Sequence, residues 1–279
     1  MIDTHAHLNF PEFDGRVTDV LASCRRAGIA EIVVPGTNLK LSARAISCAK
    51  QYSNVFAAVG IHPGEIFSWP VGDTDALRGE IDRQMEELER LACSSDRVVA
   101  IGEIGLDRYQ IIRTFGAFRQ DILDVQVALF EAQLELAKRL NLAVIIHSRE
   151  SADDLMAVLE RQWSPAQAFK MVIHCCEADV RLIKFAIDRD MYIGVDGDVT
   201  FIKKKQEFIR LVPLNRLVLE TDSPFLTPSP IREQATYPNS PEHLVYICDK
   251  VAELLGVSAE DVDRATTKNA QRLFGIGGK

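Results

Sequence analysis

The chain has 279 residues, of which 47% are hydrophobic and 26% are charged, a composition typical of a globular protein with a large core. Forty acidic and 32 basic residues give a formal net charge of −8, which argues against binding nucleic acid through a generally basic surface. Eight acids and three bases fall within residues 73–96, so this stretch carries −5 and the rest of the chain is close to neutral.

No C-x-x-C spacing joins any of the six cysteines, so the sequence predicts neither a zinc ribbon nor a thioredoxin-type pair. No run approaches the roughly 18 apolar residues that a membrane span needs, and the N-terminus lacks the order of a signal peptide. We therefore expect a cytoplasmic protein without membrane contact. The sequence indicates no obligate protein partner.

Eight short apolar runs, rich in β-branched residues, recur along the chain and are predicted to be strands. They cover residues 2–7, 31–35, 55–61, 98–104, 143–147, 170–174, 191–195 and 217–222. Their nearly continuous hydrophobicity is typical of parallel strands that are covered on both faces. Segments with helical periodicity lie between them, such as residues 125–140, where apolar side chains recur at steps of three or four.

Eight strand and helix units in about 250 residues match a (β/α)8 TIM barrel, which we expect to form one domain over residues 1–279. A doubly wound nucleotide-binding sheet is less favoured, because no G-x-G-x-x-G or G-x-x-x-x-G-K-[ST] motif occurs. Residues 106–121 are predicted to form an excursion over one mouth of the barrel. Residues 73–96 are predicted to form an outer helix, with a buried stripe of Leu77, Ile81, Met85 and Leu88.

Residue types that bind metals close five of the predicted strands. In a TIM barrel the C-terminal ends of the strands build the active site, so polar side chains there predict chemistry rather than packing. His5 and His7 are two positions apart and therefore lie on one face of their strand. Coincidence is the alternative, but four of the six histidines in the chain occupy such positions. The full set is His5, His7, Glu103, His147, His174 and Asp222.

Six candidate ligands are too many for one catalytic ion, which normally has about three protein ligands and a water. The sequence therefore predicts two divalent ions with the carboxylate of Glu103 bridging them. Imidazole with carboxylate suits Zn²⁺ or Mn²⁺, and Mg²⁺ is compatible where a phosphate supplies oxygen ligands. The other ligands are assigned as His5, His7 and Asp222 to the first ion, and His147 and His174 to the second.

A series of motifs runs in order from the first predicted strand to the last predicted helix. They are His5-Ala6-His7, Gly60-Ile61-His62-Pro63, Gly102-Glu103-Ile104-Gly105-Leu106-Asp107, Ile146-His147-Ser148-Arg149, His174-Cys175, Leu219-Glu220-Thr221-Asp222-Ser223-Pro224 and Asn269-Ala270-Gln271-Arg272-Leu273-Phe274. The series resembles the TatD family of metal-dependent deoxyribonucleases. The resemblance implies a (β/α)8 hydrolase with divalent metals that acts on DNA ends as an exonuclease, and it implies the same ligand set. Several binuclear hydrolases of the wider superfamily have a carboxylated lysine at the position of Glu103, so this glutamate favours the nuclease-like branch.

Two segments differ from the pattern typical of the family. Asp107 is followed by Arg108-Tyr109, where an aromatic residue often follows the aspartate directly. After His174 the chain has Cys175-Cys176-Glu177-Ala178 in place of a phenylalanine and a glycine-bearing turn. We interpret the two cysteines as buried thiols.

Residues at and near the ligand positions are candidates for the reaction itself. Asp222 is predicted to act as the general base, and Glu103 to serve catalysis by holding both ions. Arg149 is predicted to bind a substrate phosphate, with a local ion pair as the alternative. His62 is predicted to contact substrate, although loop packing beside its proline explains it equally well. Asp107 is placed with the substrate-binding residues, and orienting a metal-ligating imidazole or stabilising a turn are its alternatives.

The residues and the resemblance together predict hydrolysis of DNA phosphodiester bonds, preferably at single-stranded or frayed ends. Two divalent ions at the mouth would attract phosphate even in an anionic protein. The alternative enzyme is an amidohydrolase that acts on a small cyclic amide, lactone or ester at the same ions. A binding or scaffold protein on a degenerate barrel is disfavoured, because drift would be expected to remove at least one of the ligands.

Overall fold

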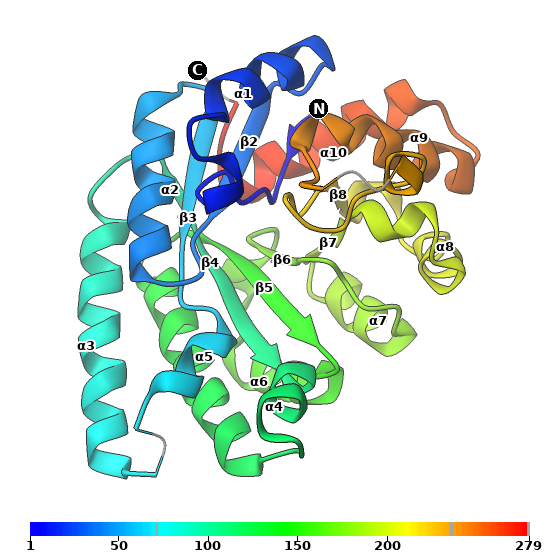
Figure 1. Ribbon diagram of the computed structural model, residues 1–279. Coiled ribbons are helices and arrows are strands. Elements are labelled where there is room, and N and C mark those ends of the chain that lie inside the picture. Colours follow the sequence, from blue (N-terminus) through cyan, green and yellow to red (C-terminus); the bar gives the residue numbers. More distant parts are fainter. Residues whose placement is uncertain (71, 235–236, 278–279) are drawn as a thin grey trace.

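The computed structural model describes residues 1–70, 72–234 and 237–277. Eight parallel strands follow one another in chain order within a single sheet. They are β1 (Ile2–Asp3), β2 (Glu31–Pro35), β3 (Val55–Val59), β4 (Val98–Asp107), β5 (Ala143–Arg149), β6 (Met171–Ile173), β7 (Tyr192–Val195) and β8 (Leu217–Leu219). Beyond β1 and β8, Ala6 forms a parallel bridge to Ser223, and the amide of Thr4 donates to the Leu219 carbonyl at 3.0 Å. The sheet thereby closes on itself, which confirms the predicted (β/α)8 barrel (Figure 1).

Helices surround the barrel on the outside (Figure 1). They are α1 (Val17–Arg26), α2 (Leu39–Gln51), α3 (Thr74–Ala92), α4 (Arg108–Phe115), α5 (Gln120–Leu140), α6 (Ala152–Gln162), α7 (Val180–Asp188), α8 (Lys203–Ile209), α9 (Leu244–Leu255) and α10 (Ala259–Phe274). Among the described residues, no helix is long and apolar enough to cross a membrane.

The strands are apolar on both faces because each face is covered by a different layer. Val33 and Ile145 belong to the cluster that fills the barrel, which Leu273 of α10 helps to close. Ile32, one residue before Val33, belongs instead to the larger cluster between the strands and the helices. Successive strand residues thus enter two separate cores, which explains the nearly continuous hydrophobicity of the sequence.

Several strands end at other residues than the sequence predicts. Strands β1, β3, β6 and β8 end earlier, so four of the predicted ligands follow their strands instead of closing them. Strands β4 and β5 are longer than predicted, because they remain paired up to Asp107 and Arg149. These two strands therefore project past the rim of the barrel and carry side chains over its mouth.

The helices also differ from the predictions in extent. Helix α5 begins five residues before the predicted start at residue 125. The predicted excursion over residues 106–121 contains the end of β4 and the helix α4, which lies below the tips of β4 and β5 in Figure 1. In α3, Leu88 is buried, but Leu77 and Met85 are only half-buried. The expected stripe is incomplete because the first turns of α3 extend beyond the end of α2 (Figure 1).

Candidate active site

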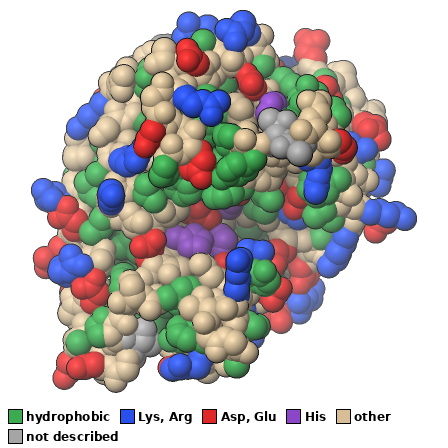
Figure 2. Space-filling view, in the orientation of Figure 1, with side chains coloured by type: hydrophobic (Ala, Val, Ile, Leu, Met, Phe, Trp, Pro, Cys, Tyr) green, Lys and Arg blue, Asp and Glu red, His purple; other side chains and the backbone are tan. Residues whose placement is uncertain are grey.

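Histidine and carboxylate side chains gather at the C-terminal mouth of the barrel. Figure 2 shows purple histidine side chains in a hollow that crosses this face of the molecule. The hollow lies where the strands end. The barrel interior below it is filled with apolar side chains, so the polar groups gather at the mouth. All six predicted ligands lie here.

The first group of ligands comes from the segments after β1 and β8. The Nε2 atoms of His5 and His7 lie 3.1 Å apart. Oδ1 of Asp222 lies 3.7 Å from Nε2 of His5 and 3.4 Å from Nε2 of His7. Oε2 of Glu103 lies 3.4 Å and 3.7 Å from the same two nitrogens. Two imidazoles and two carboxylates thus point at one small volume.

The second group comes from β5 and the segment after β6. Nδ1 of His147 lies 2.8 Å from Oε1 of Glu103, and Nε2 of His174 lies 3.9 Å from the same oxygen. Glu103 therefore turns Oε2 to the first group and Oε1 to the second. This arrangement agrees with the position that the sequence predicts for a bridging carboxylate.

Glu103 is held as an anion by its neighbours. Burial opposes its ionisation, but the imidazoles of His147 and His5 outweigh burial and hold its pKa well below the usual range. Burial also lowers the pKa of His5, and the nearby His174 lowers it further. A buried anion beside a neutral imidazole is a donor set that attracts a cation.

The geometry of His5 and His7 fits a metal ion. The Nε2 atoms of His5 and His7 face each other so closely that only one proton fits between them, and no other donor hydrogen of the described residues bonds to these atoms. Lone pairs of imidazole together with carboxylate oxygens are the ligands that transition-metal ions and zinc prefer. The residues present therefore fit the binding of divalent metal.

The second nitrogen of each imidazole in the second group faces a carboxylate. Nε2 of His147 lies 3.1 Å from Oδ2 of Asp107, and Nδ1 of His174 lies 2.9 Å from Oε1 of Glu220. Burial disfavours both imidazolium ions, but the carboxylates outweigh it and raise the pKa to about 9 for His147 and to about 10 for His174. Such partners orient the rings and fix which nitrogen is free to bind a metal.

Glu220 occupies a space that only a glycine leaves open. It is 1% exposed, and it also accepts the amide of Cys175 at 2.6 Å. A Cβ on Gly194 of β7 would lie 2.5 Å from its Oε1 atom. The sequence predicts no role for Glu220, and its place within the motif of the last strand is the one signal for it.

Asp107 is buried, which differs from the predicted substrate contact. It is 2% exposed, and its Oδ1 atom accepts the amide of Gln110 at 2.6 Å, so it caps α4. With Oδ2 beside His147, both of its oxygens have partners. The structure therefore favours the two alternatives, orienting an imidazole and stabilising a turn, over direct contact with substrate.

His62 lies at the edge of the second group. Its Nδ1 atom accepts the amide of Gly64 at 3.0 Å, so the neutral ring carries its proton on Nε2. Nε2 lies 3.9 Å from Oε1 of Glu103. Burial and the neighbouring His147 lower the pKa of His62 to about 4, which keeps it a neutral donor. Its Nδ1 atom thus holds the loop, while its Nε2–H faces Glu103.

Arg149 is exposed beside the second group. Its Cζ atom stacks 3.8 Å from the ring centre of Tyr109. Asp154, an alternative partner for this arginine, pairs instead with Arg108. Among the described residues Arg149 has no ion pair, so its guanidinium is available to an anion.

Buried polar residues that the sequence analysis missed hold these segments in place. Asp3 is fully buried, and its oxygens accept the amide of His5 at 3.2 Å and the hydroxyl of Thr221 at 2.7 Å. Burial raises the pKa of Asp3 to about 8. On α5, Gln126 accepts the amide of Asp107 at 3.0 Å. A carboxylate next to Ile2 in an apolar strand was a signal for Asp3, whereas nothing marked Gln126.

A separate buried cluster follows β6 and β7. Asp196 and Asp198 face Nζ of Lys205 at 3.6 Å and 3.2 Å. Nζ also donates to the carbonyl of Cys175 at 3.3 Å. The ammonium group occupies the position that a metal ion would need between these carboxylates. Burial raises the pKa of the thiols of Cys175 and Cys176, and Cys176 is buried as expected while Cys175 is half-buried.

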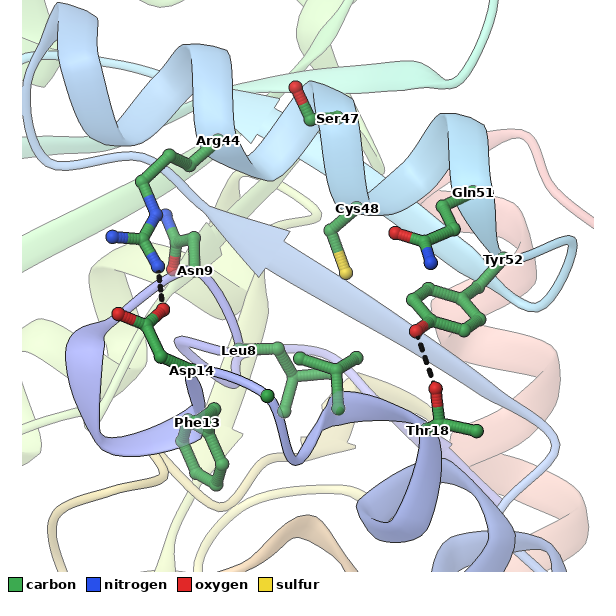
Figure 3. A pocket seen from close by; sticks show the side chains of 12 residues that line it. Leu8, Asn9, Phe13, Asp14, Thr18, Arg44, Ser47, Cys48, Gln51 and Tyr52 are labelled. Atoms are coloured by element: carbon green, nitrogen blue, oxygen red, sulfur yellow. Dashed lines mark hydrogen bonds and ion pairs between the residues drawn. The ribbon is translucent and has the colours of Figure 1, made fainter.

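A cavity of about 430 Å³ lies on the outer wall of the barrel, away from the imidazoles. It lies between α2 and the segment that leads from His7 into α1, and Figure 3 shows Arg44 paired with Asp14 at its edge. Asn9 donates to the carbonyls of Pro35 and Leu41 at 2.9 Å each, which ties the segment after His7 to β2 and α2. None of the six ligands lines this cavity.

Comparisons with known proteins agree with this geometry. Residues 2–275 match the family model of the TatD related DNases. The chain is 32% identical over 280 residues to an uncharacterized metal-dependent hydrolase, YabD, of Bacillus subtilis, covering 99% of both chains. It is 33% identical over 281 residues to the 3′-5′ ssDNA/RNA exonuclease TatD of Erwinia amylovora, covering 99% of this chain and 100% of that protein.

A solved structure supports the same assignment. The crystal structure of YjjV, a TatD homolog from Escherichia coli K12, matches with a TM-score of 0.80 and 31% identity, covering 99% of this chain and 98% of that one. The identity, the coverage and the barrel agree with the resemblance that the motifs indicate. The protein is a metal-dependent hydrolase that belongs to the TatD family.

Proposed function

We propose that the protein hydrolyses phosphodiester bonds at the ends of DNA, as an exonuclease that prefers single-stranded or frayed ends. The observation that carries this proposal is Glu103, whose two oxygens face two adjoining groups of imidazoles, with the ring of His174 stacked on that of His5. The exposed Arg149 beside the second group adds a partner for a phosphate.

Two divalent ions, Zn²⁺, Mn²⁺ or Mg²⁺, are part of the proposal. When bound, they supply positive charge that stabilises the phosphate in the transition state and makes water more acidic. A carboxylate that turns one oxygen to each group suits two ions better than one. The ligands are His5, His7 and Asp222 for the first ion, His147 and His174 for the second, and Glu103 for both.

The residues around the ions would have separate roles in the reaction. Asp222 accepts a proton from the attacking water as general base. The guanidinium of Arg149 donates hydrogen bonds to oxygens of the scissile phosphate. His62 donates its Nε2–H to the same phosphate, because its Nδ1 atom is already bonded to Gly64. Asp107 and its imidazole partner stay fixed throughout.

The distribution of charge supports access of DNA to this site. The acidic residues of α3 lie on the outer ring of helices, away from the mouth (Figure 1). Some relatives at about the same identity are named 3′-5′ ssDNA/RNA exonucleases. An amidohydrolase reaction on a small cyclic amide, lactone or ester is less favoured, because the relatives of at least 30% identity whose names state a substrate are exonucleases.

The test is an assay of the purified protein on several substrate classes with its metal content measured in parallel. We expect release of nucleotides from single-stranded DNA and from duplexes with frayed ends, and slower release from blunt duplexes. A lactone and a phosphotriester serve as competing substrates. Turnover of either one at a rate above that of DNA would overturn the nuclease proposal in favour of the amidohydrolase alternative.

A further inference from the structure

Exposed aromatic and basic side chains lie along one side of the mouth, around the segments that follow β7 and β8. Building on the proposed nuclease function, we propose that these side chains bind the single strand that leads to the scissile phosphate. Proteins that hold single strands combine aromatic rings, on which bases stack, with cations that follow the phosphates. The residues, named here the β7–β8 strip, are Phe225, Phe201, Arg232, Lys203 and Lys204.

Phe225 is the platform nearest the metal ligands. Its ring is 42% exposed, and the ring centre lies 6.3 Å from that of His7. The backbone is fixed, because the amide donates to the Asp222 carbonyl at 2.8 Å and the carbonyl accepts Nδ2 of the buried Asn239 at 2.7 Å. An exposed ring on a fixed backbone beside the imidazoles suits a base adjacent to the scissile bond.

The loop that carries this platform packs on the segment after β7, η4 (Gly197–Thr200). A Cβ on Gly197 would lie 1.9 Å from the Leu226 carbonyl oxygen, so only glycine permits this approach. The amide of Ser229 also donates to Oγ1 of Thr200 at 2.8 Å. Phe201 follows η4 directly, so the second aromatic ring of the strip belongs to a segment in contact with the first.

The second platform carries its own cation. The ring of Phe201 is 37% exposed, and Cζ of Arg232 stacks 3.7 Å from its centre. Lys203 and Lys204 follow and are exposed. Neither lysine nor Arg232 has an ion pair among the described residues, whereas Lys205 turns inward to two aspartates. Blue and green side chains accordingly adjoin each other on the α8 side of the hollow, with red ones among them (Figure 2).

On the opposite side of the mouth, Arg113 of α4 and Arg149 are exposed and have no ion pair among the described residues, but the arginines that contact exposed aromatic rings are paired. Phe115 and Phe118 are exposed near α4 and contact Arg119 and Arg108. Both of these arginines are paired with aspartates, so they offer less charge to a phosphate. A chain of phosphates is therefore favoured on the β7–β8 side. One glutamate on α8 and one on η6 (Ile231–Gln234) reduce the positive potential on that side. Stacking of bases on the aromatic rings must therefore contribute to the affinity together with the cations.

Binding of a hydrolysis-resistant strand tests the strip without turnover. Fluorescence anisotropy with a phosphorothioate oligothymidylate of about ten nucleotides measures the affinity of the metal-loaded protein at several salt concentrations. In the double variant Lys203→Ala/Lys204→Ala, the slope of log K against log salt should fall by about 1.4, at about 0.7 per phosphate contact. Phe201→Ala should lower affinity about 5- to 100-fold and leave the slope unchanged.

The matched control is Lys50→Ala/Lys268→Ala, which removes two exposed lysines at the other end of the barrel. Lys50 lies in the last turn of α2, and Lys268 precedes Asn269, which bonds to the residues that begin β8. We expect no change in slope for this control. An equal fall of slope in the control, or unchanged affinity in Phe201→Ala, would overturn the proposal.

The dependence of kcat/KM on DNA length separates the strip from the proposed function. In the unmodified protein kcat/KM should rise from a dinucleotide to about eight nucleotides, and Phe201→Ala and the Lys203→Ala/Lys204→Ala variant should lose this rise. Equal cleavage of short and long strands by the unmodified protein would refute the strip and leave the nuclease function standing. Strip-dependent binding of the oligothymidylate without cleavage of any length would support the strip and refute the nuclease.

Discussion

The two halves of the candidate metal centre hold their imidazoles in different ways. In the half formed after β1 and β8, Nδ1 of His5 and Nδ1 of His7 are buried without a hydrogen-bond partner. In the half formed at β5 and β6, Nε2 of His147 lies 3.1 Å from Asp107, and Nδ1 of His174 lies 2.9 Å from Oε1 of Glu220, although the angle there does not meet that of a hydrogen bond. The first half offers a cation two imidazoles whose Nδ1 atoms have no carboxylate partner among the described residues, whereas the imidazoles of the second half each have a carboxylate behind them.

This difference determines how protons compete with metal. Burial lowers the pKa of His5, so this ring is neutral at neutral pH and its lone pair is available. The pKa is raised to about 9 for His147 and about 10 for His174, so both rings keep a second proton at neutral pH when no metal is bound. An ion in the second half must therefore displace a proton from each ring, whereas His5 in the first half has no such proton to lose.

Removing the shared carboxylate should have the largest effect. In Glu103→Gln the shape is retained, but the negative charge that both halves share is lost. We expect metal content to fall in both halves and turnover to fall at least a hundredfold. Metal analysis and kcat measured together check this, with Glu86→Gln on the exposed face of α3 as the control. Undiminished activity of Glu103→Gln would contradict the two-ion arrangement.

The pH dependence of metal binding should separate the halves. At pH values below both raised pKa values, each fall of one pH unit lowers the affinity for the second ion by up to about a hundredfold. The reason is that two imidazoles must each lose a proton when the ion binds. Affinity should therefore rise steeply from about pH 7 to pH 9, less steeply from about pH 9 to pH 10, and level off above the pKa of His174.

Calorimetry in buffers of different ionisation enthalpy counts the protons directly. About two protons should leave with the second ion near neutral pH, and fewer with the first. Equal proton release for both ions would show that the two halves do not differ in the way their partners suggest.

The carboxylates behind the second half should matter for that half alone. Asp107→Asn and Glu220→Gln each remove the charge that orients one imidazole, and loss of such a partner typically weakens metal binding about 10- to 100-fold. At limiting metal we expect one ion per chain instead of two. If both ions were lost together in either variant, the halves would have to be treated as one unit.

Arg149 should affect substrate and neither half of the centre. Arg149→Ala should weaken a phosphodiester substrate by about 1.5 to 3 kcal/mol, the range for hydrogen bonds to charged groups, and leave metal content unchanged. The matched control is Arg139→Ala, on the outer surface of α5. Tyr109→Leu removes only the stacking contact with Arg149 and should weaken binding of the same substrate by about 0.5 to 1 kcal/mol. Loss of metal in Arg149→Ala would assign it a structural role instead.

The strands and the candidate ligands could be predicted because both depend on local residue types. Ile145 and Ile146 have to be apolar, since a strand of a parallel barrel is buried on both faces, and a histidine directly after them marks the mouth. The same reasoning applies to His174 after β6. The ends of the strands could not be predicted, because they depend on pairing with neighbours. β4 and β5 stay paired up to Asp107 and Arg149.

The order of strands, the barrel and the residue types of the six candidate ligands were determined by the sequence, through runs of apolar residues that are followed by histidine or carboxylate. Only the tertiary structure decided which nitrogen of each imidazole is free, because the partners come from elsewhere in the chain. Glu220 lies 46 positions from His174, and Asp107 lies 40 positions from His147. A buried charge is stable only with a partner, and the fold alone brings such partners together.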